Sequence, residues 1–231
     1  MKPRVTPPGE HERPVPSDAM SSSSEVVALD GRALGKRGAQ TRRRLLEATA
    51  RLLETQGVRD LRVVDIAREV GSSPATFYQY FRDVEAAVLT LADEAAEDLE
   101  PVARVLAQPW DGDAGLDAAR TMVESFLDSW DRHRAILRTR NLAAQEGDQR
   151  FRAVRNAALQ PLTEALADRI ADARRAGAVE EEISPIAAAA ALVAMTERMA
   201  AFHRELEGLG VTRDALVETT ARIINRTATG G

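Results

Sequence analysis

Hydrophobic residues recur every three or four positions along most of the chain beyond residue 83, which is the spacing of amphipathic helices. No segment shows the alternation of apolar and polar residues typical of a half-buried strand, so the chain is predicted to be all-α. Pro101 requires a kink or a break in the first of these helices, and Pro161 is expected to bend or split the fourth. The predicted helices span residues 84–108, 115–133, 135–145, 149–176, 185–207 and 213–227.

Two short helical patterns around a glycine form the most specific signal, within RVVDIAREVGSSPATFYQYF at residues 62–81. Gly71 permits the left-handed backbone that follows a helix end. Ser72 or Ser73 can cap the second helix, with Pro74 at its first position. The first helix buries one stripe, formed by Val63, Ile66, Ala67 and Val70.

The second helix is barely two turns long, and Ala75 and Phe77 are expected to pack inward. Its outward hydroxyl and amide groups suit phosphates and base edges, which predicts a DNA-reading helix-turn-helix. Gln79 is the residue most able to report base identity, because an amide can pair bidentately with adenine. For Tyr80 a place in the small core beside Phe81 stays an alternative. The outward residues are Thr76, Tyr78, Gln79 and Tyr80.

A helix reading TRRRLLEATARLLETQG precedes the motif and is expected to end at Gly57. Together with IAREVGSSPATFYQYF it resembles the N-terminal domain of the tetracycline-repressor (TetR) family of bacterial transcription regulators, over roughly residues 40–90. The resemblance implies an all-helical homodimer, a three-helix DNA-binding head, and release of DNA when a small molecule binds the C-terminal domain. The apolar line of the first helix consists of Leu45, Thr49 and Leu52, with Leu46 and Leu53 beside it.

The resemblance also assigns roles within the motif. It matches Tyr78 and Tyr80 to phosphate-contacting positions, Ser73 and Thr76 to further DNA-facing positions, and Phe77 to a buried one.

Two residues depart from the family pattern. Arg62 stands where a capping Ser or Thr is usual, and it cannot accept the amide hydrogen bonds. Val84 stands where a Lys is common, so a phosphate contact is lost, and Arg82 is a candidate replacement.

Composition divides the chain into three parts. Residues 1–31, with five prolines and a run of four serines, are expected to be a disordered extension. Residues 32–83 are expected to form the helix-turn-helix DNA-binding domain with a basic arm, and residues 84–231 a helical ligand-binding and dimerisation domain. The 231 residues, 44% of them hydrophobic, suffice for a substantial core without a cofactor.

Charge is distributed unevenly along the chain. The net charge of −5 combines +6 over residues 32–82 with −9 over residues 83–231 and −2 over the first 31 residues. A positive head on a negative body favours binding to DNA by one end, because neutralised phosphates supply most non-specific affinity.

Basic residues before the motif add further candidate DNA contacts. The segment GRALGKRGAQ is expected to be a flexible arm able to reach a minor groove through Arg32, Lys36 or Arg37, or else a solvated linker. Arginines 42–44 at the expected start of the first helix oppose its dipole and invite a phosphate, or else form a solvated face. The DNA-binding candidates are Lys36, Arg37, Thr41, Arg42, Arg43, Ser72, Ser73, Pro74, Ala75, Thr76, Tyr78, Gln79 and Tyr80.

The last two predicted helices begin with the capping residues Ser184 and Thr212. The resemblance implies that they pair with their symmetry mates in a homodimer, whereas an internal core is the alternative. Dimerisation is favoured because so short a recognition helix needs two half-sites for useful affinity. The small residues that allow close helix approach are Ala187, Ala191, Ala194 and Ala201.

Aromatic and methionine side chains gather in the C-terminal part although aromatics make up only 4% of the chain. They favour an apolar pocket for a small lipophilic effector, with ordinary core packing as the alternative. Arg138, Arg140, Asn141 and Gln145 could orient a polar head group or form a wet surface. The ligand-binding candidates are Trp110, Met122, Phe126, Trp130, Leu137, Asn141, Phe151, Met195, Met199 and Phe202.

The sequence lacks the residues that several other classes of function require. Without cysteine there is no disulfide, thiol catalysis or cysteine-type zinc site, and His133 and His203 have no second ligand at metal-site spacing. No cofactor is expected, and the chain is not expected to be an enzyme. The alanine-rich run 186–195 is too short to span a membrane, so a cytoplasmic protein is expected. A ligand-independent DNA-binding regulator, an activator and a small helical enzyme stay as alternatives.

Overall fold

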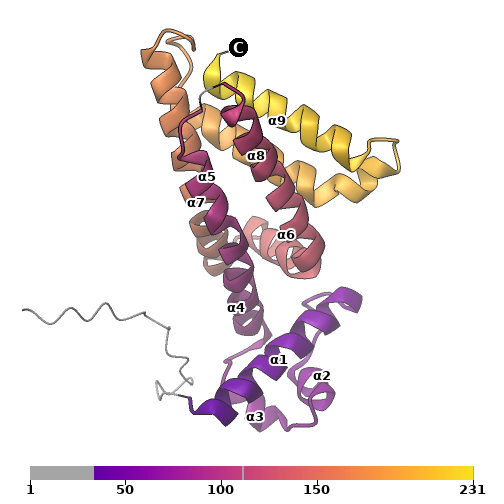
Figure 1. The fold of residues 1–231 in the computed structure, drawn as a ribbon. Helices are drawn as coiled ribbons and strands as arrows, with labels where there is room; N and C mark the ends of the chain where they lie inside the picture. The colour runs from indigo at the N-terminus through magenta and orange to yellow at the C-terminus, as the bar shows by residue number, and fades with distance from the viewer. Residues whose placement is uncertain (1–33, 111, 231) are drawn as a thin grey trace, which may run out of the picture.

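The computed structural model describes residues 34–110 and 112–230, and within them every regular element is helical, which confirms the predicted all-α class (Figure 1). The arm residue Arg32 and the predicted extension at 1–31 lie outside the described residues. The elements are α1 Lys36–Thr55, α2 Val63–Glu69, α3 Pro74–Tyr78, α4 Val84–Ala96, η1 Glu97–Leu99, α5 Glu100–Leu106, α6 Ala114–Gln145, α7 Gln149–Arg175, α8 Pro185–Glu207 and α9 Arg213–Thr229.

The head consists of α1, α2 and α3, which pack around a small apolar core (Figure 1). α1 buries Leu45, Leu46 and Leu53 on one face, as its spacing predicts. Phe77 of α3 is completely buried, whereas Ala75 is exposed, so the expectation that Ala75 packs inward is wrong. A helix of five residues has little more than one turn, so only one of its side chains points into the core of the head, and that side chain is Phe77.

α1 begins earlier than expected, because its helical backbone already starts at Lys36. Lys36 and Arg37 therefore belong to a helix and not to a flexible arm. Arginines 42–44 lie in its second and third turns, too far from the end for the helix dipole to act on them. At the other end α1 stops at Thr55 because Gln56 is extended, and Gly57 has no left-handed φ.

The turn between α2 and α3 follows the predicted geometry. Gly71 has φ of 67°, and Ser73 is the cap, since its hydroxyl accepts from the Thr76 N–H at 3.2 Å. Pro74 is at the first helical position. This local chemistry fixes the orientation of α3 relative to α2.

α4 joins the head to the rest of the molecule, here called the body (α4–α9). The predicted helix 84–108 is broken before Pro101, where η1 separates α4 from α5. The core of the head continues through Val84 and Val88 of α4 to Ile136 of α6 and Phe151 of α7. The head thus shares a packed core with parts of α4, α6 and α7, whereas the rest of the body has a core of its own.

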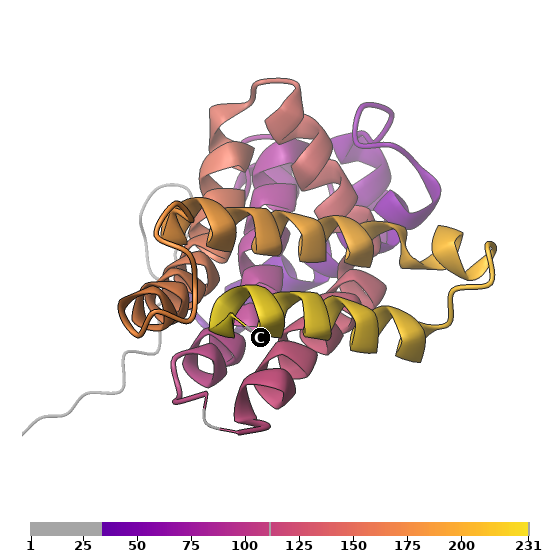
Figure 2. The ribbon, with the colours of Figure 1, turned by 90° about the horizontal axis from the view of Figure 1, so that it is seen from above.

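The body contains two long helices, α6 and α7, covered by α8 and α9. α6 is kinked at His133, with φ −122° and ψ 23°, which is where two separate helices were predicted. α7 runs through Pro161 without being split, because the proline is exposed and water can take the carbonyl it leaves free. Viewed from above, α8 and α9 lie side by side across the body (Figure 2).

The capping expectations for these two helices have different outcomes. The Thr212 hydroxyl accepts from the Ala215 N–H at 3.2 Å and caps α9. The Ser184 side chain makes no such bond, so α8 starts with Pro185 at its first turn and no side-chain cap.

We predict that Gly71→Ala destabilises the folded protein by about 1–2 kcal/mol, because an alanine Cβ disfavours the left-handed backbone at this turn. Gly57→Ala is the matched control, since Gly57 has ordinary dihedral angles and its nearest contact for a Cβ is 3.5 Å away. Urea unfolding followed by circular dichroism measures both. Equal stability of the two variants would contradict the role assigned to Gly71.

Candidate functional site

α3 presents its polar side chains on the surface of the head. Tyr78 is 53% exposed, and its ring stands edge-on to the buried Phe77 with centroids 5.9 Å apart. Gln79 is exposed, while the Thr76 hydroxyl lies 3.1 Å from the Ser73 hydroxyl. Pro74 and Ala75 are exposed and Ser72 is half-buried. The face predicted to read DNA is therefore open.

The N-terminal turns of α1 adjoin this face. A Cβ placed on Gly38 would lie 3.7 Å from the Tyr80 hydroxyl, so Tyr80 is half-buried between α1 and the motif. Lys36 and Arg37 are exposed on the same turns, and the half-buried Thr41 donates its hydroxyl to the Arg37 carbonyl at 3.0 Å. These residues extend the polar surface of α3 with positive charge.

The three arginines of α1 have different partners. Arg42 lies over the Phe81 ring, 5.2 Å from its centroid. Arg43 pairs with Glu47 at 3.1 Å and with Glu94 of α4 at 2.8 Å.

Arg44 donates to the Val70 carbonyl at 2.9 Å and so takes up a free acceptor at the end of α2. Its guanidinium is engaged within the head.

The departures at Arg62 and Val84 are visible in the structure. Arg62 precedes α2 without any capping bond, and its Nε instead bonds Asp65 at 3.1 Å. Val84 is buried at the start of α4, which Asp83 caps by accepting from the Ala86 N–H at 2.7 Å. Arg82 bonds Asp83 at 3.0 Å.

A cavity of about 870 Å³ opens between α6, α7 and α8. Three of the predicted ligand-binding residues line it: Trp130, Asn141 and Phe202. Phe126 and Leu137 instead border a gap of only about 10 Å³ beneath it, together with Trp130.

The other five ligand-binding candidates line neither space. Met122 is completely buried in the body core, against which Met195 and Met199 pack half-buried. Phe151 belongs to the core shared with the head. Trp110 is half-buried and donates its indole N–H to the Leu106 carbonyl at 3.1 Å.

A buried ion cluster forms part of the cavity wall. Glu197 of α8 is 5% exposed and accepts from Arg140 at 2.9 Å, from Asn141 at 3.2 Å and from two nitrogens of Arg155. Burial lowers the pKa of Arg140 to about 10, against the opposing effect of Glu197. Arg140, 3% exposed, is thus neither a wet surface residue nor open to a ligand.

Sequence reasoning missed Glu197. The sequence signal for it was an acidic residue directly after the apolar stretch 185–196 of a predicted helix. Other predicted helices carry arginines that can pair with it. A carboxylate in such a position needs a buried cationic partner.

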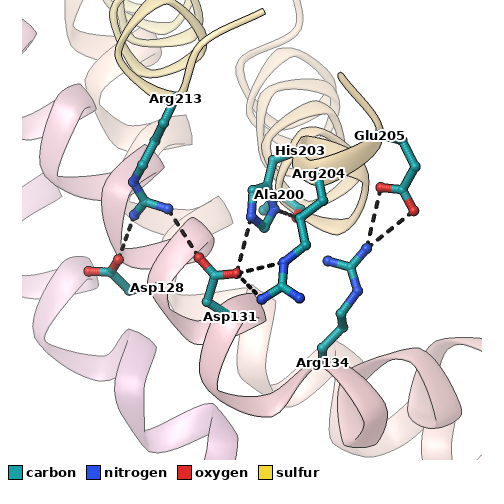
Figure 3. A network of polar contacts seen from close by, with 8 residues as sticks. All are labelled: Asp128, Asp131, Arg134, Ala200, His203, Arg204, Glu205 and Arg213. Carbon is teal, nitrogen blue, oxygen red and sulfur yellow. Dashed lines mark hydrogen bonds and ion pairs between the residues drawn. The ribbon is translucent and has the colours of Figure 1, made fainter. Parts of the chain in front are cut away.

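A second polar network ties the kink of α6 to α8 and α9 (Figure 3). Asp131 accepts from Arg204 at 2.7 Å and Arg213 at 3.2 Å, and lies 3.1 Å from Nε2 of His203. The His203 Nδ1 lies 2.7 Å from the Ala200 carbonyl. Burial raises the pKa of Asp131, but the hydrogen bond from Arg204 and the charges of Arg204 and Arg213 outweigh burial and hold this pKa below its usual value.

α8 has the length and composition of a membrane-spanning helix, with a mean hydropathy of 1.3 over its best window, although the run 186–195 alone is short. It carries the charges Glu197 and Arg198 and packs against α6, α7 and α9. Helices in the core of soluble proteins can have this composition too, and 33% of this window is buried in the fold.

We predict that Glu197→Gln lowers the free energy of unfolding by about 3 kcal/mol or more, because it leaves the buried Arg140 without a counter-charge. Glu205→Gln is the control, since Glu205 is exposed and its bond to Arg134 is expected to contribute little to stability. Denaturant unfolding of both variants measures the difference. A similar decrease in the free energy of unfolding of both variants would show that the negative charge of Glu197 is not needed for stability.

Comparison with known proteins gives two family matches. Residues 45–87 match the profile described as bacterial regulatory proteins, tetR family, and residues 102–231 match the tetracyclin repressor-like C-terminal domain. The second match alone covers more than half of the chain.

Characterised relatives agree with these matches. The chain is 32% identical over 120 residues to the HTH-type transcriptional regulator EthR of Mycobacterium tuberculosis, an alignment covering 51% of this chain and about half, 55%, of that protein. The EthR of Mycolicibacterium smegmatis is 28% identical over 205 residues, with 88% and 94% covered.

Solved structures share the fold. FadR from Bacillus subtilis in complex with stearoyl-CoA has a TM-score of 0.60 at 13% identity, with 82% of this chain and 98% of that chain covered. A Rhodococcus sp. RHA1 protein of unknown function has a TM-score of 0.61 at 19% identity, covering 80% and 93%. The matches to both parts of the chain and the helix-turn-helix head lead to one conclusion: this protein belongs to the TetR family of transcriptional regulators.

Proposed function

We propose that the protein is a homodimeric repressor that binds a palindromic operator and leaves it when a small lipophilic molecule occupies the body. Residues 32–83 act as the DNA-binding domain and residues 84–231 as the effector-binding and dimerisation domain. The chain acts by binding and not by catalysis, in the cytoplasm. The observation that carries the proposal is the open polar face of α3 beside the basic start of α1.

DNA contact is assigned to two elements of the head. α3 enters the major groove with Tyr78 on a phosphate and Gln79 on a base edge, because Tyr78 at the end of α3 and its C-cap residue Gln79 are both exposed. Lys36 and Arg37 on α1 supply further phosphate contacts, since they are exposed beside Tyr80.

Two copies associate through α8 and α9 in this proposal. Ala187 and Ala191 are exposed small residues one turn apart on α8, where they allow close helix approach. On α9, Ile223 is 43% exposed. These small and apolar side chains on two adjacent helices support burial against an identical surface, which is how a two-fold dimer forms.

The effector acts through differential affinity for two spacings of the heads, since only that shifts the equilibrium between them. The shared core supports this coupling, because α4 and α6 pack against α1 of the head and α7 contributes Phe151 to the same core. FadR structures with stearoyl-CoA and lauroyl-CoA, from Bacillus subtilis and Thermus thermophilus, support a lipophilic effector for this chain.

We predict that Tyr78→Ala or Gln79→Ala weakens operator binding by about 1–3 kcal/mol, because each removes a groove contact. An operator is first selected from random duplexes, and gel shifts then give the affinities. Gln160→Ala, an exposed position on α7, is the matched control and should bind as the unchanged protein does. Unchanged affinity in both head variants would sink the proposed readout.

We predict that Ala191→Glu together with Ile223→Glu converts the dimer to a monomer, because four charges would then face each other across the two-fold interface. Sedimentation velocity reports the mass. Val64→Glu, on the exposed side of α2, is the control and should stay dimeric. A dimer that survives the double substitution must use another surface.

A further inference from the structure

Positive charge dominates the lining of the cavity between α6, α7 and α8. Five guanidinium groups and two carboxylates line it. Glu205 forms an ion pair with Arg134. Glu197 forms ion pairs with Arg155 and with the buried Arg140, which does not line the cavity. Within the described residues, the lining guanidinium groups without a carboxylate partner are Arg138, Arg152 and Arg198.

Several arginines of the lining have N–H groups that are not fully used in hydrogen bonds. The Arg134 Nη1 is buried and has no hydrogen-bond partner among the described residues. Arg152 donates only a long bond, 3.4 Å, to the Ala144 carbonyl. Arg155 has five N–H groups and gives two to Glu197. A buried N–H without an acceptor is destabilising, so an anionic oxygen here would be favoured.

The same cavity also has apolar side chains in its lining. Trp130 and Leu142 of α6 and Phe202 of α8 contribute them. Arg198 stacks on the Phe202 ring, with its guanidinium carbon 3.8 Å from the centroid, which keeps this cation beside apolar surface.

An adjoining groove of about 480 Å³ between α7 and α8 continues the cavity. The two spaces share Arg155, Asn156 and Ala194, so the charged region passes directly into the groove. Leu159, Ile186 and Val193 make the groove mainly apolar. The site therefore has a cationic end and a long hydrophobic end.

Resting on the ligand-responsive function proposed above, we propose that the effector is an anionic amphiphile. Its acid group lies among Arg138, Arg152 and Arg155, and its hydrocarbon part lies along the groove toward Ile186. Glu197 is a positioning residue that fixes the guanidinium of Arg155 through two hydrogen bonds. The carboxylate of a fatty acid and the phosphates of its CoA thioester share this chemistry.

Titration of the full-length protein with five probes tests the charge requirement. Isothermal titration calorimetry is run below the critical micelle concentrations with dodecanoate, 1-dodecanol, dodecyltrimethylammonium, lauroyl-CoA and CoA. We expect dodecanoate or lauroyl-CoA to bind at least about tenfold more tightly than the alcohol, and the cation not to bind. Tighter binding of dodecanoate identifies a free acid, and tighter binding of lauroyl-CoA identifies the thioester phosphates. Equal binding of the alcohol overturns the proposal.

Variants locate the site. Arg138→Gln is expected to weaken the preferred probe about tenfold without loss of fold, because Arg138 is exposed and unpaired. Arg155→Gln is the second variant, and Arg104→Gln on α5, outside the cavity, is the matched control. Unchanged binding in both cavity variants, or an equal loss in the control, also overturns the proposal.

Gel shifts without any probe separate this inference from the function on which it rests. If no DNA sequence from a pool of random duplexes binds the protein, the proposed regulator function is wrong, whatever the titrations show. If the operator is retained and dodecanoate and lauroyl-CoA bind no better than dodecanol, only the assignment of an anionic effector fails.

Discussion

The apolar core shared by head and body is the constraint on which the arrangement of the molecule depends. Phe77 and Phe81 of the head, Val88 of α4, Ile136 of α6 and Phe151 of α7 belong to one buried cluster. Because protein interiors are close-packed, the head cannot shift relative to α4 and α6 without repacking this cluster. Head orientation is therefore set by the body helices and not by a loose linker.

Charged groups add a second set of connections between the body helices. Glu197 joins α8 to α6 and α7 through Arg140 and Arg155, and Asp131 joins α6 to α8 and α9. Buried ion pairs are weak contributors to net stability but costly to leave half-made. The buried Glu197 pairs therefore favour one relative position of α6, α7 and α8, whereas the Asp131 pairs are partly solvent-exposed and contribute less.

The sequence predicted the fold well where the signals are local. Gly71, Ser73 and Pro74 determine their turn by backbone preference and capping, and the structure has that turn. The start of α1 was missed because the three glycines of GRALGKRGAQ lower its intrinsic helix preference.

Predicting the cavity was harder, because helical spacing identifies a buried stripe but not the helix that covers it. Met122 and Trp130 share one stripe of α6, yet Met122 is in the core and Trp130 reaches the cavity. Which residues contact DNA or effector stays a prediction, since those contacts depend on molecules that local patterns do not describe.

The positions of the cavity arginines connect binding of the proposed effector to the packing of the head. Arg138 lies beyond the kink of α6 at His133, on the same half of the helix as Ile136, which packs in the core shared with the head. Arg155 and Arg198 lie on α7 and α8. An anion that bonds α6 and α7 together is sensitive to their separation, and it favours the arrangement in which both arginines reach it. Because Ile136 lies on the same helix two residues from Arg138, a movement of this half of α6 would change the packing that orients the head.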